Sequence, residues 1–170
     1  HGQGLAEKLV YEEVEKPTIT DDQLLVKVYA SSVNQIDWKK ASGKMGPLQF
    51  PWIQGMDFTG QVERVGNNVE GFSVGEPVVG CHNGGAYAEY IAVGPENIVH
   101  NPEDVSFVDA VAASYVSQPA WPALNDHGKL MKGQRALIHW AACAVGAFAV
   151  QLDIIIDTDV YAPVAGSDER

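Results

Sequence analysis

The chain has 170 residues, a mass of 18.3 kDa and a hydrophobic fraction of 46%, which is ordinary for a packed globular protein. Its 11 basic and 22 acidic side chains give a net charge of −11, a field that repels nucleic-acid backbones and anionic lipid surfaces. No apolar run approaches the ~20 residues that span a bilayer, and no signal-peptide pattern opens the chain. We therefore expect no nucleic-acid partner, no membrane span, and a cytoplasmic protein with reduced cysteines.

The first hundred residues read as short strands separated by Gly, Pro and Asn. The alternation of side chains predicts strands over residues 24–29, 58–65, 74–80 and 86–93. Short strands with frequent turn signals are typical of an antiparallel barrel or sandwich.

From Ser106 the pattern becomes helical, because Ser106 followed by Asp109 resembles a helix N-cap. Pro119 and Pro122 each remove a backbone donor, so we expect the helix to bend or break there. Residues 135–140 predict a buried strand, 147–152 a helix and 160–164 a second strand, which is the opening of a βαβ unit. One such unit would leave the apolar run 154–156 without a partner, so we expect the chain to be incomplete or part of an assembly.

The turn after the first of these two strands is the candidate cofactor site. A dinucleotide pyrophosphate binds where backbone N–H groups and a helix dipole converge, and glycines there allow close approach. The candidate residues are Ala142, Cys143, Ala144, Val145 and Gly146. Only Gly146 has the expected identity, so a structural turn of small residues is an equally good interpretation.

The end of the second strand should read the adenosine ribose, where an acidic residue would select NADH. Ala165, Gly166 and Ser167 stand there instead, with Arg170 nearby. This favours NADPH, with Ser167 as a candidate contact. The alternative is that these residues only cap a helix.

The order of several motifs is more specific than that turn. It resembles the medium-chain dehydrogenase/reductase superfamily, in its zinc-free quinone oxidoreductase (zeta-crystallin-like) branch. The similarity runs over nearly the whole chain and rests on residues 33–39, 51–62, 65–66, 72–78, 84–90, 119–124 and 137–142.

The resemblance implies a mixed α+β and α/β architecture. A GroES-like β-barrel domain over residues 1–105 is expected to precede a linking helix and the first βαβ unit of an incomplete Rossmann domain over 106–170. It also implies that a first strand and most of the Rossmann domain lie outside the chain, and that a full-length chain would form a homodimer.

The resemblance also implies which chemistry is available. In zinc-dependent relatives a Cys ligand occupies the place of Asn34 and a His-Glu pair that of Met56-Asp57, and neither Asn nor Met suits zinc. No metal is expected. The implied reaction is hydride transfer from NADPH to a quinone or an α,β-unsaturated carbonyl, a small-molecule substrate, with Asn34 and Met56 in the nicotinamide or substrate pocket.

Other roles for these side chains stay open at this stage. Asn34 could simply cap a helix, and Asp37 is expected to bond nearby backbone amides. Trp38 and Trp52 are expected to pack in the barrel rather than stack on a quinone. The catalytic residue itself is not identified.

Three departures from the family pattern count against activity. Cys143 and Ala144 replace paired glycines, Pro119 replaces a threonine at the cofactor side, and residues 157–159 replace a Gly-Ala pair. The alternative function is therefore a non-catalytic binding or structural protein on the same scaffold, with NADPH binding weakened or lost.

Overall fold

The computed structural model describes residues 2–4 and 6–163, which divide into two compact units, His1–Ser114 and Tyr115–Arg170. Ser167 and the residues around it, predicted to meet the adenosine ribose, lie outside the described residues. Within the described residues no helix combines the length and apolar character needed to cross a membrane.

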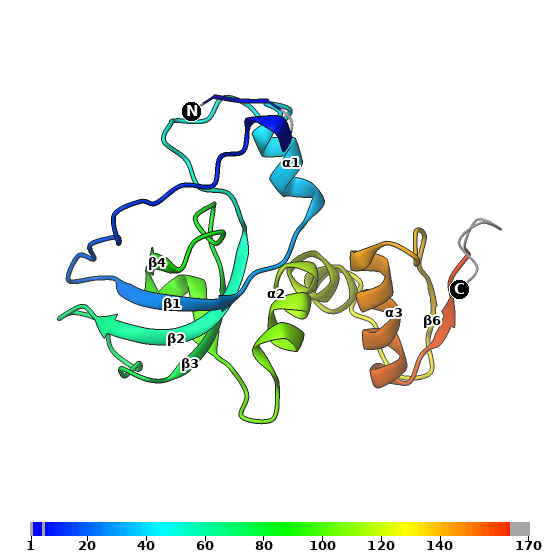
Figure 1. Ribbon diagram of the computed structural model, residues 1–170. Helices are drawn as coiled ribbons and strands as arrows, with labels where there is room; N and C mark the ends of the chain where they lie inside the picture. Colours follow the sequence, from blue (N-terminus) through cyan, green and yellow to red (C-terminus); the bar gives the residue numbers. More distant parts are fainter. Residues whose placement is uncertain (1, 5, 164–170) are drawn as a thin grey trace. The chain divides into compact units, whose positions relative to one another are not determined.

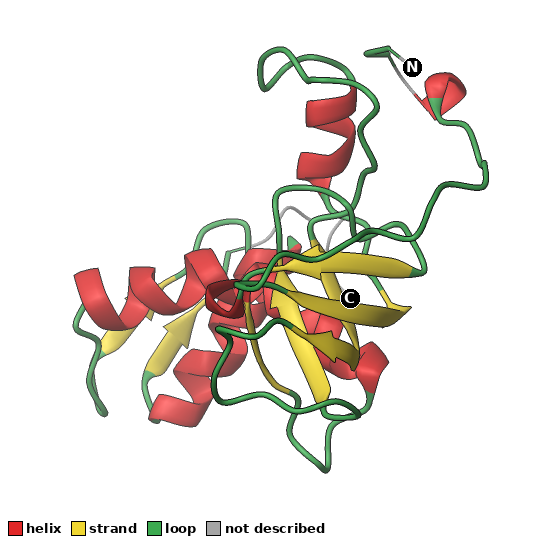
Figure 2. Cartoon of the chain, turned by 90° about the vertical axis from the view of Figure 1, so that its left-hand side faces the viewer, coloured by secondary structure: helices red, strands yellow, loops and turns green. Residues whose placement is uncertain are grey.

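The first unit is built on a five-stranded antiparallel sheet with the strand order β4-β1-β2-β3-β5 (Figures 1 and 2). Its elements are η1 (Ala6–Lys8), β1 (Leu24–Ala30), α1 (Gln35–Ala41), β2 (Asp57–Val65), β3 (Pro77–Cys81), β4 (Tyr90–Val93), η2 (Pro95–Asn97) and β5 (Ile98–His100).

The core of this unit follows from alternation along the strands. One face of each strand buries apolar side chains, and successive side chains point to opposite faces of a sheet. The buried cluster consists of Leu24, Val26, Phe58, Val62, Val78, Ala86, Ile91, Val93 and Ile98. The antiparallel arrangement predicted for the first hundred residues is therefore observed, with this cluster as its core.

The strand predicted over residues 86–93 is shorter than expected, because it begins only at Tyr90. Gly84 and Gly85 adopt φ values of 109° and 92°, which turn the chain out of the sheet. The Gly85 and Tyr87 amides then bond the carbonyls of Ile53 and Gln54 instead of a neighbouring strand. This segment is thereby tied to the loop that precedes β2.

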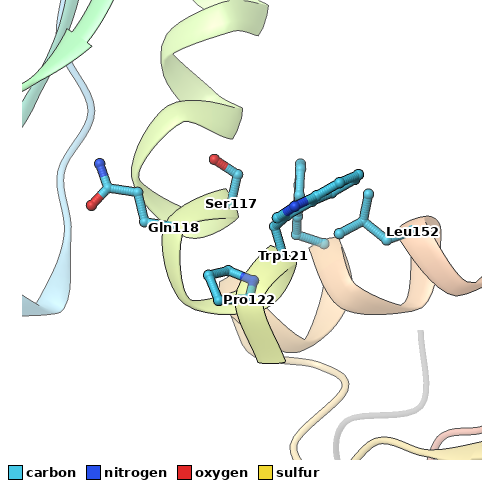
Figure 3. Close-up of a pocket in the computed structure, with 6 residues that line it drawn as sticks. Ser117, Gln118, Trp121, Pro122 and Leu152 are labelled. Carbon is cyan, nitrogen blue, oxygen red and sulfur yellow. The ribbon is translucent and has the colours of Figure 1, made fainter. Parts of the chain in front are cut away.

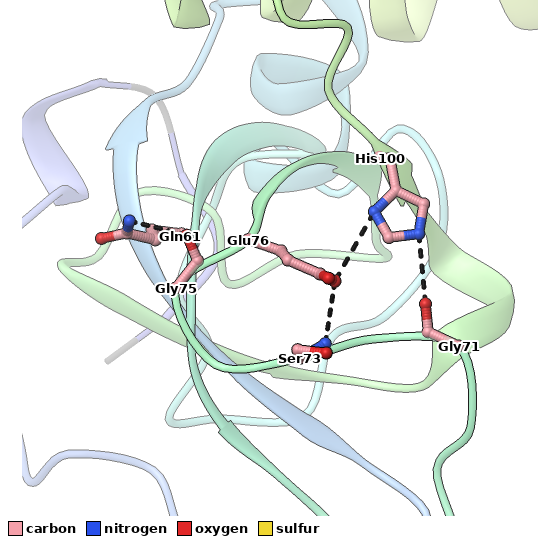
Figure 4. A network of polar contacts seen from close by, with 6 residues as sticks. All are labelled: Gln61, Gly71, Ser73, Gly75, Glu76 and His100. Atoms are coloured by element: carbon pink, nitrogen blue, oxygen red, sulfur yellow. Dashed lines mark hydrogen bonds and ion pairs between the residues drawn. The ribbon is translucent and has the colours of Figure 1, made fainter.

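A polar network fixes the loop between β2 and β3 (Figure 4). The Glu76 carboxylate accepts from the Ser73 amide at 2.8 Å and lies 3.7 Å from Nδ1 of His100. The other ring nitrogen of His100 lies 3.1 Å from the Gly71 carbonyl oxygen, and its ring stacks on Phe72. The network joins β5 to this loop and contains none of the candidate site residues.

The second unit takes its first residues from the helix α2 (Phe107–Trp121), which begins in the first unit. Ser106 caps α2 as predicted, because its hydroxyl oxygen accepts from the Asp109 amide at 3.1 Å. Of the bend or break predicted at Pro119, a break does not occur, since α2 continues to Trp121. The change of helix type falls at Pro122, where the π-helix η3 (Pro122–His127) starts.

The rest of the second unit is a βαβ unit. Strand β6 (Arg135–Leu137) pairs in parallel with β7 (Asp159–Tyr161), and α3 (Ala144–Ile156) connects them. The expectation of a buried strand up to Trp140 is wrong: β6 ends at Leu137, which is 62% exposed, and Trp140 is 81% exposed with φ 60°. Within the described residues β6 pairs only with β7, so this sheet has two strands.

Candidate active site

Five polar side chains meet where the chain leaves β1, enters α1 and returns through β2. Ser32 and Asn34 lie in the connection between β1 and α1, and Asp37 lies in the first turn of α1. Asp57 is the first residue of β2, and Tyr87 belongs to the loop that the glycines turn out of the sheet. We call this set the polar cluster.

The Asp57 carboxylate is the centre of the polar cluster and is fully buried. It accepts hydrogen bonds from the Ser32 amide at 3.1 Å, the Ser32 hydroxyl at 2.6 Å and the Asn34 side-chain amide at 3.2 Å. Burial raises the pKa of Asp57, although these hydrogen bonds oppose the rise. The donors to this carboxylate come from Ser32 and Asn34, so the carboxylate orients Asn34 directly.

Asp37 performs the structural role predicted for it. Its Oδ2 accepts from the Asn34 backbone amide at 2.7 Å and from the Tyr87 hydroxyl at 3.0 Å, while only 2% of the residue is exposed. Burial, together with the Asp37 hydrogen bond and charge, raises the pKa of Tyr87, so the hydroxyl stays protonated and acts as a donor. Asn34 is therefore both the N-cap residue of α1 and a member of the polar cluster.

Met56, the second predicted pocket residue, lies directly before Asp57. Its Sδ is 3.3 Å from Nζ of Lys40, and its carbonyl oxygen accepts from the His82 amide at 2.7 Å. Lys40 also donates to the side-chain oxygen of Asn83. Among the described residues, Met56 is therefore linked to Asn34 only through its chain neighbour Asp57, which accepts a hydrogen bond from Asn34.

Sequence reasoning missed Ser32, Tyr87 and Lys40 as residues of the candidate site. Tyr87 lies within segment 84–90, one of those on which the family resemblance rests, and Lys40 is one of three lysines within residues 39–44. Both features could have pointed to these residues. The expectation that Trp38 packs in the barrel is wrong, because Trp38 lies on α1 and is 44% exposed. The Nζ atom of Lys44 lies 4.5 Å from the centroid of its ring. Trp52 is half-buried.

In the second unit, the turn between β6 and α3 has the predicted strand–turn–helix form. Cys143 is the N-cap residue of α3, and its Sγ accepts from the Gly146 amide at 3.3 Å. A Cβ on Gly146 would lie 2.3 Å from the Trp140 carbonyl oxygen, so only glycine fits there. Gly146 therefore packs the helix against the turn, as expected for the packing glycine.

Among the described residues, the predicted cofactor residues other than Gly146 are accessible to a ligand. Ala142, Cys143, Ala144 and Val145 are exposed along the turn and the first turn of α3. Pro119 is an exposed residue of α2. A cap by a cysteine side chain was not foreseen, because Cys is a rare N-cap residue.

An apolar pocket lies between α2, η3 and α3 within the second unit (Figure 3). Its volume is about 660 Å³, and its lining is Ser117, Gln118, Trp121, Pro122, Phe148 and Leu152. The indole ring of Trp121 extends toward Leu152. None of the predicted cofactor residues lines this pocket, so it is distinct from the candidate phosphate turn.

Comparisons with known proteins agree with this architecture. Residues 20–103 match the alcohol dehydrogenase GroES-like domain family. A chloroplastic quinone-oxidoreductase homolog of Spinacia oleracea is 37% identical over 94% of this chain and 52% of its own, and the chloroplastic quinone-oxidoreductase QR1 of Triphysaria versicolor is 34% identical over the same shares. The solved structure of a mycobacterial protein complexed with NADPH superposes with a TM-score of 0.87 at 27% identity, covering 98% of this chain and 52% of that one.

These matches, together with the fold, define the class. The chain belongs to the medium-chain dehydrogenase/reductase superfamily, an oxidoreductase family, with a GroES-like domain followed by a βαβ unit of the Rossmann type. Within that superfamily it belongs to the quinone oxidoreductase branch. The chain spans about half the length of the curated relatives that it matches.

Proposed function

We propose that the protein is a zinc-independent oxidoreductase that uses NADPH to reduce a quinone or an α,β-unsaturated carbonyl. The observation that carries the proposal is the hydrogen bond from the Asn34 side chain to the buried Asp57 carboxylate, at 3.2 Å. The bond fixes the Asn34 amide on Asp57, the residue that follows Met56 in the chain. By the family resemblance, these are the positions at which zinc-dependent relatives have their ligands. Neither an amide nor a thioether suits zinc, so the donor set favours chemistry without a metal.

The β6–α3 turn supports the NADPH part of the proposal. Two backbone amides, those of Ala144 and Val145, lie in the first turn of the 13-residue helix α3, where N–H groups and the helix dipole hold phosphates. The third amide, that of Gly146, is taken by Cys143 Sγ. The residues thus fit a pyrophosphate with one donor fewer than usual, and we expect weak binding.

The residues of the first unit supply positioning. When bound, the reduced nicotinamide supplies the hydride. Asn34 would contact the nicotinamide or the substrate through its side-chain oxygen, because its Nδ2 donates to Ser32 and Asp57, which fix the orientation of the amide. The Tyr87 hydroxyl and Asp37 hold the backbone of Asn34 in place, so their role is to position it.

A second candidate function is non-catalytic binding on the same scaffold. It is favoured by the Cys143 cap, which removes a phosphate donor, and by Pro119, which has neither hydroxyl nor N–H at the position of the family threonine. Under this alternative, the polar cluster only stabilises the barrel.

Titration of the purified chain with NADPH and NADH, followed by nucleotide fluorescence, separates the two candidates. If the protein is an NADPH-dependent oxidoreductase, we expect saturable NADPH binding in the micromolar range, with a higher affinity for NADPH than for NADH. No detectable binding of either nucleotide would favour the non-catalytic alternative. A homodimer, a cytoplasmic location and the lack of a nucleic-acid partner remain predictions.

A further inference from the structure

We infer that the ammonium group of Lys40 is the cationic hydrogen-bond donor of the substrate pocket and binds the substrate oxygen that becomes negatively charged on reduction. The inference rests on the proposed function, because the negative charge that Lys40 would bind develops on the substrate oxygen during the proposed reduction.

Three segments bring Lys40 to this place. It lies on α1, six residues after the N-cap Asn34, and its Nζ is 3.3 Å from Sδ of Met56. The third segment is the loop after β3, in which Asn83 accepts a hydrogen bond from Lys40. Met56 directly precedes Asp57, which holds the Asn34 side chain, so the ammonium group is linked to Met56 directly and to Asn34 through Asp57.

The partners of Lys40 leave its positive charge uncompensated by a direct ion pair. Among the residues that the structure describes, Lys16 pairs with Glu63 and Lys132 with Asp157, whereas no carboxylate lies within ion-pair distance of Lys40. An ammonium group has three donors, and among the described residues that of Lys40 donates to Asn83 and to the weak acceptor Met56. At least one donor is therefore available to a ligand oxygen.

The surroundings of Lys40 strengthen its interaction with an anion. The residue is half-buried, and burial lowers its pKa while the charge of Asp37 opposes this shift. A partly desolvated cation interacts more strongly with a developing negative charge than a fully hydrated one does. The chain as a whole carries a net charge of −11, so an anionic oxygen needs such a local cation.

The test uses a neutral and an anionic quinone with the intact chain and needs no nucleotide. The neutral probe is 1,4-naphthoquinone, and the anionic one is 2-hydroxy-1,4-naphthoquinone, whose enolate form at neutral pH mimics the charged oxygen. Isothermal titration calorimetry measures both affinities for the wild type, Lys40→Met and Lys44→Met. Lys44 is the matched control, because it is an exposed lysine of the same segment whose ammonium lies over the Trp38 ring.

We expect Lys40→Met to weaken binding of the anionic quinone about tenfold or more and to change the neutral quinone by less than about threefold. Lys44→Met should leave both affinities near the wild-type values. Retained anion binding in Lys40→Met, or an equal loss in Lys44→Met, would overturn the role of Lys40.

The outcomes also separate this inference from the proposed function. If quinone binding depends on Lys40 while NADPH does not bind, the role of Lys40 stands and the cofactor proposal fails. If the wild type binds neither quinone, the substrate proposal and the role of Lys40 both fall.

Discussion

The Nδ2 atom of Asn34 lies 3.2 Å from Oδ2 of Asp57, a carboxylate that is fully buried in the first unit. A charged acceptor without access to water needs donors, and Asn34 and Ser32 provide them. The pair links Asn34, the N-cap residue of α1, to Asp57, the first residue of β2. The hydrogen bond that supplies the buried Asp57 carboxylate with a donor therefore also fixes the side chain of the predicted pocket residue Asn34.

Replacing Asn34 by Asp should put two carboxylates in contact and destabilise the protein by about 1–3 kcal/mol at neutral pH. Both carboxyls would have folded-state pKa values above their unfolded values. The loss of stability should therefore be small at pH values near the pKa of the carboxyls in the unfolded chain. It should grow as the pH rises toward their pKa in the folded protein. Urea unfolding at several pH values measures it. Asn34→Ala, which adds no charge, should show a smaller pH dependence; equal profiles would contradict this account.

Replacing Cys143 and Ala144 together by Gly should tighten NADPH binding. The change frees the Gly146 amide from the Cys143 sulfur and removes two Cβ atoms from the phosphate turn. Nucleotide titration of the double variant measures the effect. Cys143→Ser is the matched control, because a serine hydroxyl can keep the cap and should bring no gain. Unchanged or weaker binding in the glycine variant would refute our explanation of this turn.

Asp153→Ala should stabilise the protein by about 1–3 kcal/mol. Asp153 is fully buried on α3, and among the described residues neither carboxylate oxygen has a hydrogen-bond partner. Burial raises its pKa, so the folded state binds a proton more tightly than the unfolded state.

The gain from Asp153→Ala should therefore be smallest at pH values below the unfolded carboxyl pKa and increase as pH rises toward the folded value. Thermal unfolding at several pH values is the measurement. Asp126→Ala, an exposed aspartate in η3, serves as control and should change stability little. A destabilised Asp153→Ala variant at neutral pH would argue that the carboxylate has a favourable role.

Thr59→Val should cost about 1–2 kcal/mol of unfolding free energy. The Thr59 hydroxyl donates to the Phe107 carbonyl oxygen at 2.8 Å from a fully buried position in β2. Valine keeps the shape but leaves that carbonyl without this donor, whereas Thr59→Ser keeps the hydroxyl. Denaturant titration should therefore rank serine above valine, and the reverse order would show that the methyl group outweighs the hydrogen bond.

Most of the fold could be predicted from local patterns. Alternation placed β1 and β2 within a residue or two of their observed bounds, and the Ser106–Asp109 spacing located the start of α2. The strand predicted over residues 86–93 begins only at Tyr90, because Gly84 and Gly85 redirect the chain, a backbone conformation that side-chain alternation does not reveal.

Part of the candidate site was predictable, but mainly from the family resemblance. The resemblance singled out Asn34 and Met56, and the polar side chain of Asp37 predicted hydrogen bonds to nearby backbone amides. The position of Lys40 depends on Asn83, which is 43 residues away, and the Cys143 cap depends on the local turn geometry. Asp153 is buried on the same face of α3 as Gly146 and Ala149. Sequence periodicity alone predicts an exposed position for a charged residue, so it does not predict this burial.

The central claim is that this chain is an NADPH-dependent, zinc-independent quinone or enone reductase. The most direct test is the rate of NADPH oxidation when 1,4-naphthoquinone is added to the purified chain in the presence of a zinc chelator. The account predicts a rate above that of buffer alone, proportional to protein concentration and unchanged by the chelator. A rate equal to that of buffer would contradict the claim.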